Sequence, residues 1–330
     1  MTEQKKPYKW IDREIESLDP YKDYPQIFRL SMSYGGNDFI NTLMYSLIFP
    51  SFIVTEWGAR AIWREDGGKV LNKPADRVEQ TENRNAAWWW YGPHDPRTKQ
   101  SVESINKLHS YWAKHYKGDF SHNDDYIYTL ASTAVFMHRL RLQLGLPGVT
   151  DNVKTASFLV MRDMAPLFRA EGGNLFIPFR KTGMACSNFG NLCANALYDL
   201  FAFRFFPKPL RWFRRSVPIA LSLPTTLRAH RIKPVNPMLK ALIIWVVSWI
   251  FWLQDNVFPD PQVAFIQRLE GLTPDDQSRR RYEIRKVDKD YGLYFANRHS
   301  EVPAWGGCPY HEALKVVRKG GFPATEYKME

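Results

Sequence analysis

The sequence predicts an all-α protein built as a single large helical domain. Apolar residues recur with the period of a helix from about residue 38 to 255, whereas the Val, Ile and Thr alternation typical of strands is scarce. At 330 residues the chain is long enough to bury a sizeable core. We expect an N-terminal extension over 1–37, the helical domain over 38–256 and a polar C-terminal appendage over 257–330.

Three helical segments are expected in the first part of that domain. Segment 38–63 is apolar but contains Pro50, which removes a backbone donor and should kink or end a helix. A loop with turn signals over 64–74 precedes a helix over 75–92. Asp95 is a good N-cap and Pro96 suits the first helical position, so the next helix should run from about 96 to 116.

One histidine lies in the middle of an apolar stripe on that third helix. The stripe has spacings of three and four residues, so it should face the interior, and it consists of Val102, Ile105, His109, Trp112 and Tyr116. His109 has three common explanations: a core histidine bonded to a carbonyl, a general base, or a metal or haem ligand. The other histidines form no HExxH or HxxxH pair, and the three cysteines form no CxxC pair, so a zinc site is not indicated.

The next helices follow from their caps. Ser121 or Asn123 should begin a helix that ends at the GLPG turn, and the short connection predicts that it packs antiparallel to the preceding helix. The residues that share its inner face are Ile127, Leu130, Ala134, Met137 and Arg141. Thr150 should cap a helix from about 151 to 168, and another should end before Pro207.

Segment 237–256 is an apolar, Trp-rich helix and the strongest membrane candidate. Its uncharged run, Ala241 to Leu253, rises only about 20 Å, against a hydrocarbon core of about 30 Å. Its three Trp and the basic clusters 204–215, 227–234 and 279–286 fit a helix that lies in the membrane interface. The alternatives are a buried core helix and a solvated basic face.

Composition narrows the choice of partners. Lys plus Arg exceed Asp plus Glu by 45 to 34, and aromatic residues make up 15% of the chain. Arginine flanked by aromatics, without Gly-rich or zinc-finger patterning, does not favour nucleic acid. The odd number of cysteines favours a reducing compartment, and residues 1–26 lack the apolar core of a signal peptide. The oligomeric state is left open.

Four motifs in order resemble the catalytic domain shared by rubber oxygenases (latex clearing proteins) and fungal MpaB-type endoplasmic-reticulum oxygenases. They are RVEQT (77–81), NKLH (106–109), GDFSHNDDYIYTLAS (118–132) and RLQLGLPGVTDNVKTASFLVMRDMAPLF (141–168). The family pattern is Arg-x-x-x-Thr, a basic residue followed by Leu or Met and His, then Ser or Ile-x-Asn-Asp. The resemblance covers roughly residues 45 to 235.

The resemblance implies an all-helical fold with a haem b pocket between helices. His109 would be the ligand to the iron, and the other lining residues would be Ile105, Trp112 and Tyr116. Many relatives have His-Pro where this chain has Phe49-Pro50. That difference removes a polar group from the first helix.

The resemblance also implies catalytic residues on the far side of the haem. Arg77 and Thr81 would line that side, and Gln80 stands where rubber oxygenases have a lysine that caps the iron. A neutral amide could hydrogen-bond to dioxygen without ligating iron. The family's carboxylate base lies upstream of the arginine; by spacing it is Glu65 or Glu56, with Glu65 favoured.

The implied function is a haem-b-dependent oxygenase that cleaves a carbon–carbon double bond in an apolar, isoprenoid or lipid-like substrate. It would be membrane-associated, at the endoplasmic reticulum in a eukaryote. The helix that anchors the protein would then also give access to a substrate dissolved in the bilayer. The main alternative is a non-catalytic haem- or lipid-binding membrane-associated protein. A third is an all-α scaffold in which His109 is a satisfied core residue.

Overall fold

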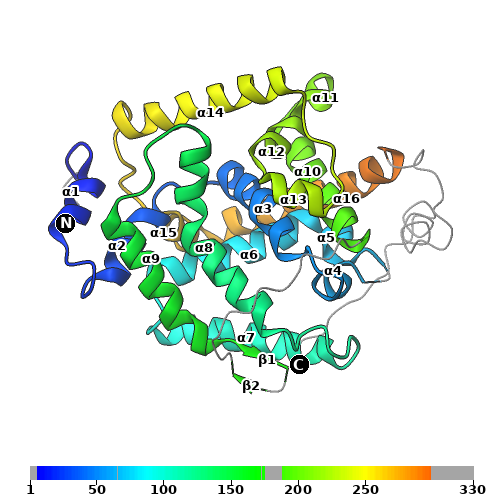
Figure 1. Ribbon diagram of the computed structural model, residues 1–330, viewed down its shortest axis with the longest axis horizontal. Helices are drawn as coiled ribbons and strands as arrows, with labels where there is room; N and C mark the ends of the chain where they lie inside the picture. The colour runs from blue at the N-terminus through cyan, green and yellow to red at the C-terminus, as the bar shows by residue number, and fades with distance from the viewer. Residues whose placement is uncertain (1–5, 65, 172, 175–187, 299–330) are drawn as a thin grey trace.

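The described residues form helices, and the all-α prediction is confirmed. The structure is a computed structural model that describes residues 6–64, 66–171, 173–174 and 188–298 (Figure 1). The helices before the strands are α1 (Trp10–Ser17), α2 (Tyr24–Ser33), α3 (Asp38–Phe52), α4 (Glu56–Trp63), α5 (Gly68–Asn72), α6 (Pro74–Tyr91), α7 (Pro96–Ala113), α8 (Asn123–Gln143), α9 (Asp151–Met164) and the 3-10 turn η1 (Ala165–Leu167). The described strands, β1 (Arg169–Ala170) and β2 (Gly173–Asn174), pair antiparallel.

The remaining elements include the most buried helix and the most exposed one. They are α10 (Asn188–Phe205), the 3-10 turn η2 (Lys208–Leu210), α11 (Arg211–Arg214), α12 (Ser216–Leu221), α13 (Pro224–Ala229), α14 (Pro237–Asn256), α15 (Phe265–Glu270) and α16 (Pro274–Arg298). The termini of α7, α9 and α14 are capped by side-chain oxygens of Asp95, Thr150 and Asn236. Two of these three caps, Asp95 and Thr150, were expected from the sequence.

Local signals place the helices that carry the site. Pro50 lies in the last turn of α3, and the helix ends two residues later at Phe52. This agrees with the expectation that a residue without a backbone N–H would kink or end the helix. Helix α7 begins at Pro96 but ends at Ala113, three residues before its predicted end. The predicted loop over 64–74 contains the short helix α5. Gly67 precedes α5 and Gly68 begins it, with φ of 83° and 54°, and a Cβ on Gly68 would lie 2.3 Å from the Ile62 carbonyl oxygen.

Helix α10 lies at the centre of the molecule. Nine of its residues are at most 1% exposed: Cys193, Ala194, Ala196, Leu197, Tyr198, Asp199, Leu200, Phe201 and Ala202. One side of the helix is polar, where Arg215 binds Asn195 and Asp199, and its other sides are apolar and have to be enclosed. It packs against α3, α4, α5, α6, α12 and α16.

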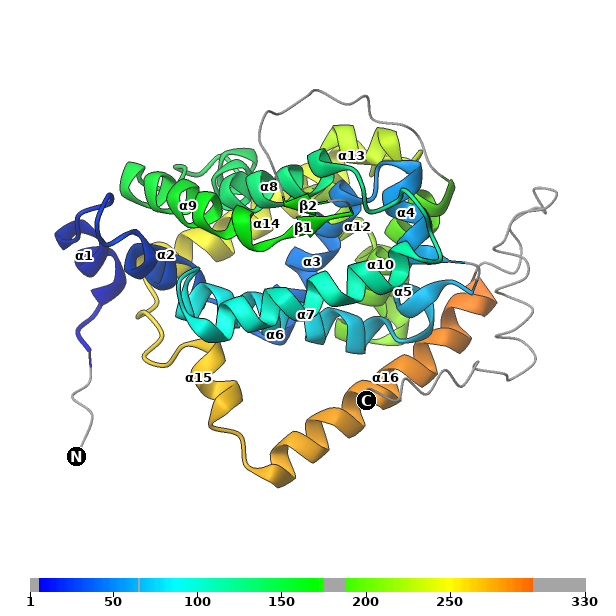
Figure 2. The same cartoon turned by 90° about the horizontal axis from the view of Figure 1, so that it is seen from below.

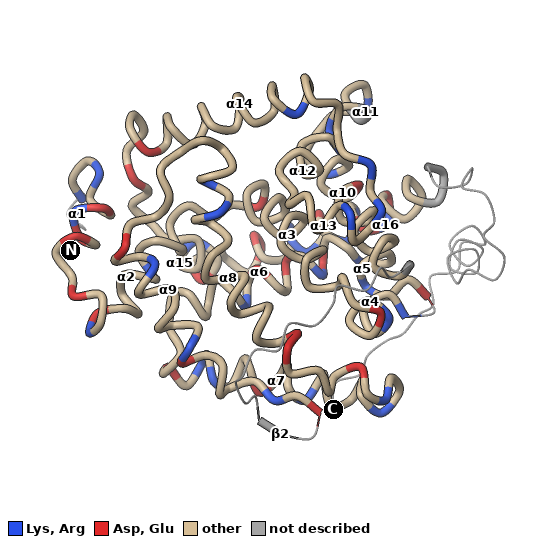
Figure 3. Tube along the Cα trace, in the orientation of Figure 1, with Lys and Arg blue, Asp and Glu red and all other residues tan. Residues whose placement is uncertain are grey.

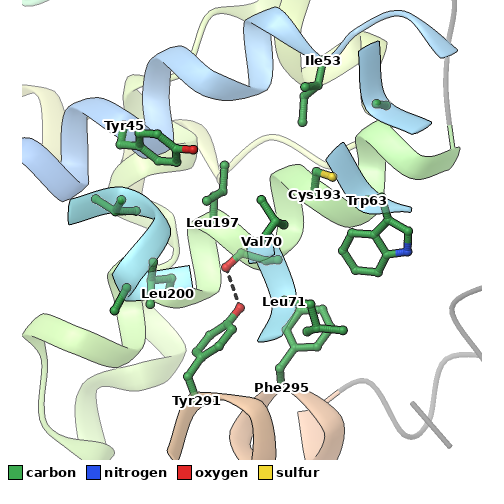
Figure 4. Packing of buried hydrophobic residues seen from close by; sticks show 14 of the residues in the cluster. Tyr45, Ile53, Trp63, Val70, Leu71, Cys193, Leu197, Leu200, Tyr291 and Phe295 are labelled. Carbon is green, nitrogen blue, oxygen red and sulfur yellow. Dashed lines mark hydrogen bonds between the residues drawn. The ribbon is translucent and has the colours of Figure 1, made fainter. Parts of the chain in front are cut away.

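Both ends of the described chain contribute to apolar clusters. Trp10 and Ile15 of α1 pack in one cluster with residues of α2, α6, α9 and α15. Tyr291 and Phe295 of α16 are at most 1% exposed and pack toward α10, where the Tyr291 hydroxyl donates to the Ala196 carbonyl at 2.5 Å (Figure 4). Helices α1, α2 and α16 thus contribute side chains to apolar clusters, while the domain boundaries expected after residues 37 and 256 stay predictions.

Helices α7 and α8 do not pair as predicted. Helix α8 packs mainly against α9 and α3, and α7 packs against α6. Figure 2 shows α8 and α9 on one side and α6 and α7 on the other. The short loop after α7 fixes how far apart the two helices can lie but does not make them pack closely.

Helix α14 has the predicted bounds, and it is long and apolar enough to cross a membrane. It lies along one edge of the molecule (Figure 1), and Ile243 is its only buried residue. Trp245 is 61% exposed and Ile250 is 55% exposed. The interpretation of this segment as a buried core helix is therefore wrong.

We predict that truncating Tyr291 destabilises the domain. Tyr291→Ala leaves a cavity beside α10 and removes the hydrogen bond to the Ala196 carbonyl, and should lower the free energy of unfolding by about 3–5 kcal/mol, measured by urea denaturation. Tyr282→Ala on the same helix is the control, because Tyr282 is 68% exposed; it should change that free energy by less than about 0.5 kcal/mol. Equal losses in the two variants would contradict the central role of α16.

Candidate functional site

His109 projects from α7 toward α8 and is held by one nitrogen. Its Nδ1 lies 3.3 Å from the Tyr126 hydroxyl of α8. Its ring lies 5.1 Å from that of Phe120 and 5.8 Å from that of Tyr126, measured between centroids. Within the described residues no hydrogen bond reaches Nε2. The imidazole is thus oriented at one nitrogen and open to a further partner at the other.

The surroundings of His109 keep it neutral. Burial, together with the positive charges of Arg77 and Arg84, lowers the pKa of His109 to about 4. Both arginines are on α6, seven residues apart, so they share one face of that helix. Neutral imidazole is the form that ligates a metal.

A hollow opens beside His109. It has a volume of about 460 Å³, which lies within the range of small-molecule sites. Its wall includes Phe120 and Ala113 together with the charged Lys114, Lys117, Arg169 and Glu171. The wall of the hollow is therefore mixed, with apolar side chains and more positive than negative ones.

Arg77, Thr81 and Tyr45 form a second group, on α6 and α3. The Arg77 Nε donates to the Tyr45 hydroxyl at 2.9 Å, and the Arg77 guanidinium lies 4.9 Å from the Phe49 ring centroid. The Thr81 hydroxyl donates to the Arg77 carbonyl at 3.0 Å. Burial raises the pKa of Tyr45, while its hydrogen bonds with Arg77 and Thr81 oppose that rise. The structure thus brings the predicted pair Arg77 and Thr81 together with a buried phenol.

Two further ionisable residues on α6 were not identified from the sequence. Arg84 is half-buried, and it forms no ion pair among the described residues. Burial and the charge of Arg77 lower the pKa of Arg84. Glu82 is 7% exposed, and burial raises its pKa to about 8. Helical spacing could have identified both residues. Arg84 lies seven residues after Arg77, and Glu82 lies between Val78 and Ala86 on the buried face.

Several predicted site residues lie elsewhere. The Gln80 amide is exposed: its nitrogen donates to the Asp76 carboxylate at 3.0 Å, and its oxygen accepts from Lys69 at 3.1 Å. Trp112 packs under the Arg64 guanidinium, 4.6 Å from its ring centroid, and beside Tyr116. Tyr116 follows the end of α7.

The remaining predictions have mixed outcomes. Ile105 is half-buried on α7, as the stripe requires, and Glu56 is exposed in the first turn of α4. Glu65 lies outside the described residues. Among the described residues no group of three or more His, Cys, Asp or Glu side chains could hold a metal ion. That observation does not bear on a haem, which needs a single histidine from the protein.

Comparison with known families and with characterised proteins gave no match to this chain.

We predict that Glu82 makes stability fall as pH rises. The folded state keeps its proton up to about pH 8, whereas an exposed glutamate loses it near pH 4.5. Between these values the free energy of unfolding should fall by about 1.4 kcal/mol per pH unit from this group. Glu82→Gln should remove that component, as measured by urea denaturation from pH 5 to 8. Glu56→Gln, at an exposed position, should leave the slope unchanged; equal slopes in wild type and Glu82→Gln would disprove the assignment.

Proposed function

We propose that this protein is a membrane-associated, haem-b-binding oxygenase that cleaves a carbon–carbon double bond in an apolar isoprenoid or lipid-like substrate. In a eukaryotic cell its membrane would be the endoplasmic reticulum. The observation that supports this best is the imidazole of His109, which is neutral, oriented through Nδ1 and without a partner on Nε2 in the described part of the chain.

The residues around His109 fit a haem ligand. Ligation through Nε2 requires the proton to be on Nδ1, so Nδ1 would donate to the Tyr126 oxygen. That hydrogen bond would fix the tautomer and the ring orientation, as partners of metal-bound histidines commonly do. Phe120 adds an apolar wall beside the ring.

The two arginines fit the charge of the cofactor. Haem b carries two propionates, and guanidinium groups are the usual partners of carboxylates in proteins. Arg84 has no anionic partner among the described residues, and Lys114 and Lys117 on the wall of the hollow offer a second place for carboxylates. Haem would compensate the positive charge that Arg77 and Arg84 place near a neutral imidazole.

When bound, haem would supply the activation of dioxygen. The protein would contribute two polar groups in an apolar setting: the Tyr45 hydroxyl held by Arg77, and the Glu82 carboxyl, which in its ionised form would raise the pKa of Tyr45. Glu82 keeps its proton at neutral pH because it is buried. It is therefore the described carboxyl on α6 best suited to hold a proton for transfer, whereas Glu79 is paired with Arg280.

A non-catalytic haem carrier is the second candidate, and one observation favours it. Gln80 faces solvent and is engaged by Lys69 and Asp76. It therefore does not replace the lysine that caps the iron in the resembling oxygenases. A pocket that keeps the haem ligand without that polar group suits storage or transport.

We predict a Soret band that depends on His109. Purified wild type should bind added haem, and His109→Ala should lose the band because the iron loses its only protein ligand. His115→Ala is the control, since His115 is exposed after the end of α7. A folded wild type that remains colourless with added haem would reject both the oxygenase and the carrier.

We predict oxygen consumption when the haem-loaded protein meets polyprenyl or farnesyl-bearing compounds, with carbonyl products detected by mass spectrometry. Glu82→Gln should slow turnover by at least about tenfold, if it handles a proton, while the Soret band is retained. Binding of these compounds without oxygen uptake would favour the carrier. Glu283→Gln, at an exposed position of α16, serves as the matched control.

A further inference from the structure

Helix α14 is apolar on every side, but protein covers only one of its sides. Ile243 is buried, and Ile244, Val247 and Phe251 pack on the cluster that contains Leu140 and Leu221. The opposite side is exposed over the whole helix. We call it the α14 face; it consists of Met238, Leu242, Trp245, Val246, Trp249, Ile250 and Trp252, each 41% to 83% exposed. A continuous exposed apolar surface of this kind marks an interaction site.

Contacts along its length hold α14 flat against the domain. The Ser248 hydroxyl donates to the Leu144 carbonyl, and Arg141 pairs with Asp255 at 2.8 Å. The Tyr8 hydroxyl donates to the Asn256 carbonyl at 2.9 Å. Figure 1 shows the helix lying lengthwise on the molecule. Turning it to cross a bilayer would break these contacts at its middle and its C-terminal end.

An apolar hollow adjoins the α14 face. It has a volume of about 610 Å³ and lies between α14 and the turn Leu144–Gly145–Leu146. Trp245 and Trp249 form part of its wall. Flexible acyl chains could fill such a hollow, whereas a flat protein surface would leave it empty.

Positive charge gathers at the N-terminal end of the helix. Lys208, Arg228, Arg231 and Lys233 are exposed there, Lys240 is half-buried, and none of the five forms an ion pair within the described residues. Figure 3 shows basic segments near α11, α13 and that end of α14. No Asp or Glu occurs from residue 237 to 254. At the other end Asp255 pairs with Arg141, and Asp260 pairs with Lys9 at 3.6 Å.

We infer that α14 docks in the plane of an anionic phospholipid bilayer. The Trp side chains of the α14 face enter the boundary between headgroups and acyl chains, where aromatic residues are favoured. The five cations bind the acidic headgroups beside the N-terminal end. The inference rests on the membrane association proposed above and does not depend on haem.

The test is co-sedimentation of the full chain with vesicles of phosphatidylcholine, with and without an equal part of phosphatidylserine. Binding is expected to need phosphatidylserine and to weaken in high salt. Arg228→Gln/Lys233→Gln should weaken binding by about tenfold, whereas Lys99→Gln/Lys107→Gln, which removes the same charge from α7, should not. Trp245→Ser/Trp249→Ser should weaken it by about tenfold or more, with Tyr21→Ser/Tyr282→Ser as the control.

Two further measurements distinguish a helix lying in the bilayer surface from a membrane-spanning helix and from a dimer interface. Phospholipids brominated near the headgroup should quench Trp fluorescence of wild type more than those brominated near the chain ends, and Trp245→Ser/Trp249→Ser should reduce that quenching. Stronger quenching by the deep bromines would indicate a spanning helix and overturn the inference. So would equal binding to neutral vesicles, or a wild-type dimer that this Trp variant converts to a monomer. His109→Ala should bind vesicles like wild type, so a colourless protein that binds vesicles rejects only the haem proposal.

Discussion

The enclosure of α10 is the constraint on which the rest of the structure depends. Because most of this helix is apolar and buried, other helices must cover it, and α3, α4, α6 and α16 do so. The same packing places Tyr45 of α3 against Arg77 of α6, since both helices are positioned by α10. The polar group of the candidate site is therefore a consequence of how the apolar core is closed, and α16 completes that core through Tyr291.

Helices α10 and α14 show why composition alone does not decide burial. Both are rich in apolar residues, yet α10 has a run of fully buried residues and α14 has only Ile243 as a buried residue. What covers a helix depends on which other segments reach it, and those contacts are long-range. On α14 they come from one side, through α12 and the residues near Leu144. Burial of the apolar α14 face would therefore contribute favourable free energy only when a partner covers that face.

The sequence predicted the features that depend on residues close together in the chain. The starts of α6, α7 and α9 follow from proline and side-chain caps, and the inward placement of Val102 follows from helical period. It did not predict that α7 packs on α6 instead of α8, because loop length limits distance without choosing the neighbour. The same limit applies to the site. Tyr126 and Arg84 meet His109 through tertiary placement, while Gln80 turns to solvent, where Lys69 and Asp76 bind its amide.

The structure also separates two features that the sequence had suggested were one. Helices α14 and α7 lie at opposite edges of the molecule in Figure 1, so the α14 face and the hollow beside His109 are separate surfaces. The hollow between α3, α8 and the end of α12 lies on the α14 side, but at about 30 Å³ it is too small for a lipid chain. The pKa of His109 is set by burial and by Arg77 and Arg84 of α6, and no cation near the N-terminal end of α14 contributes to it.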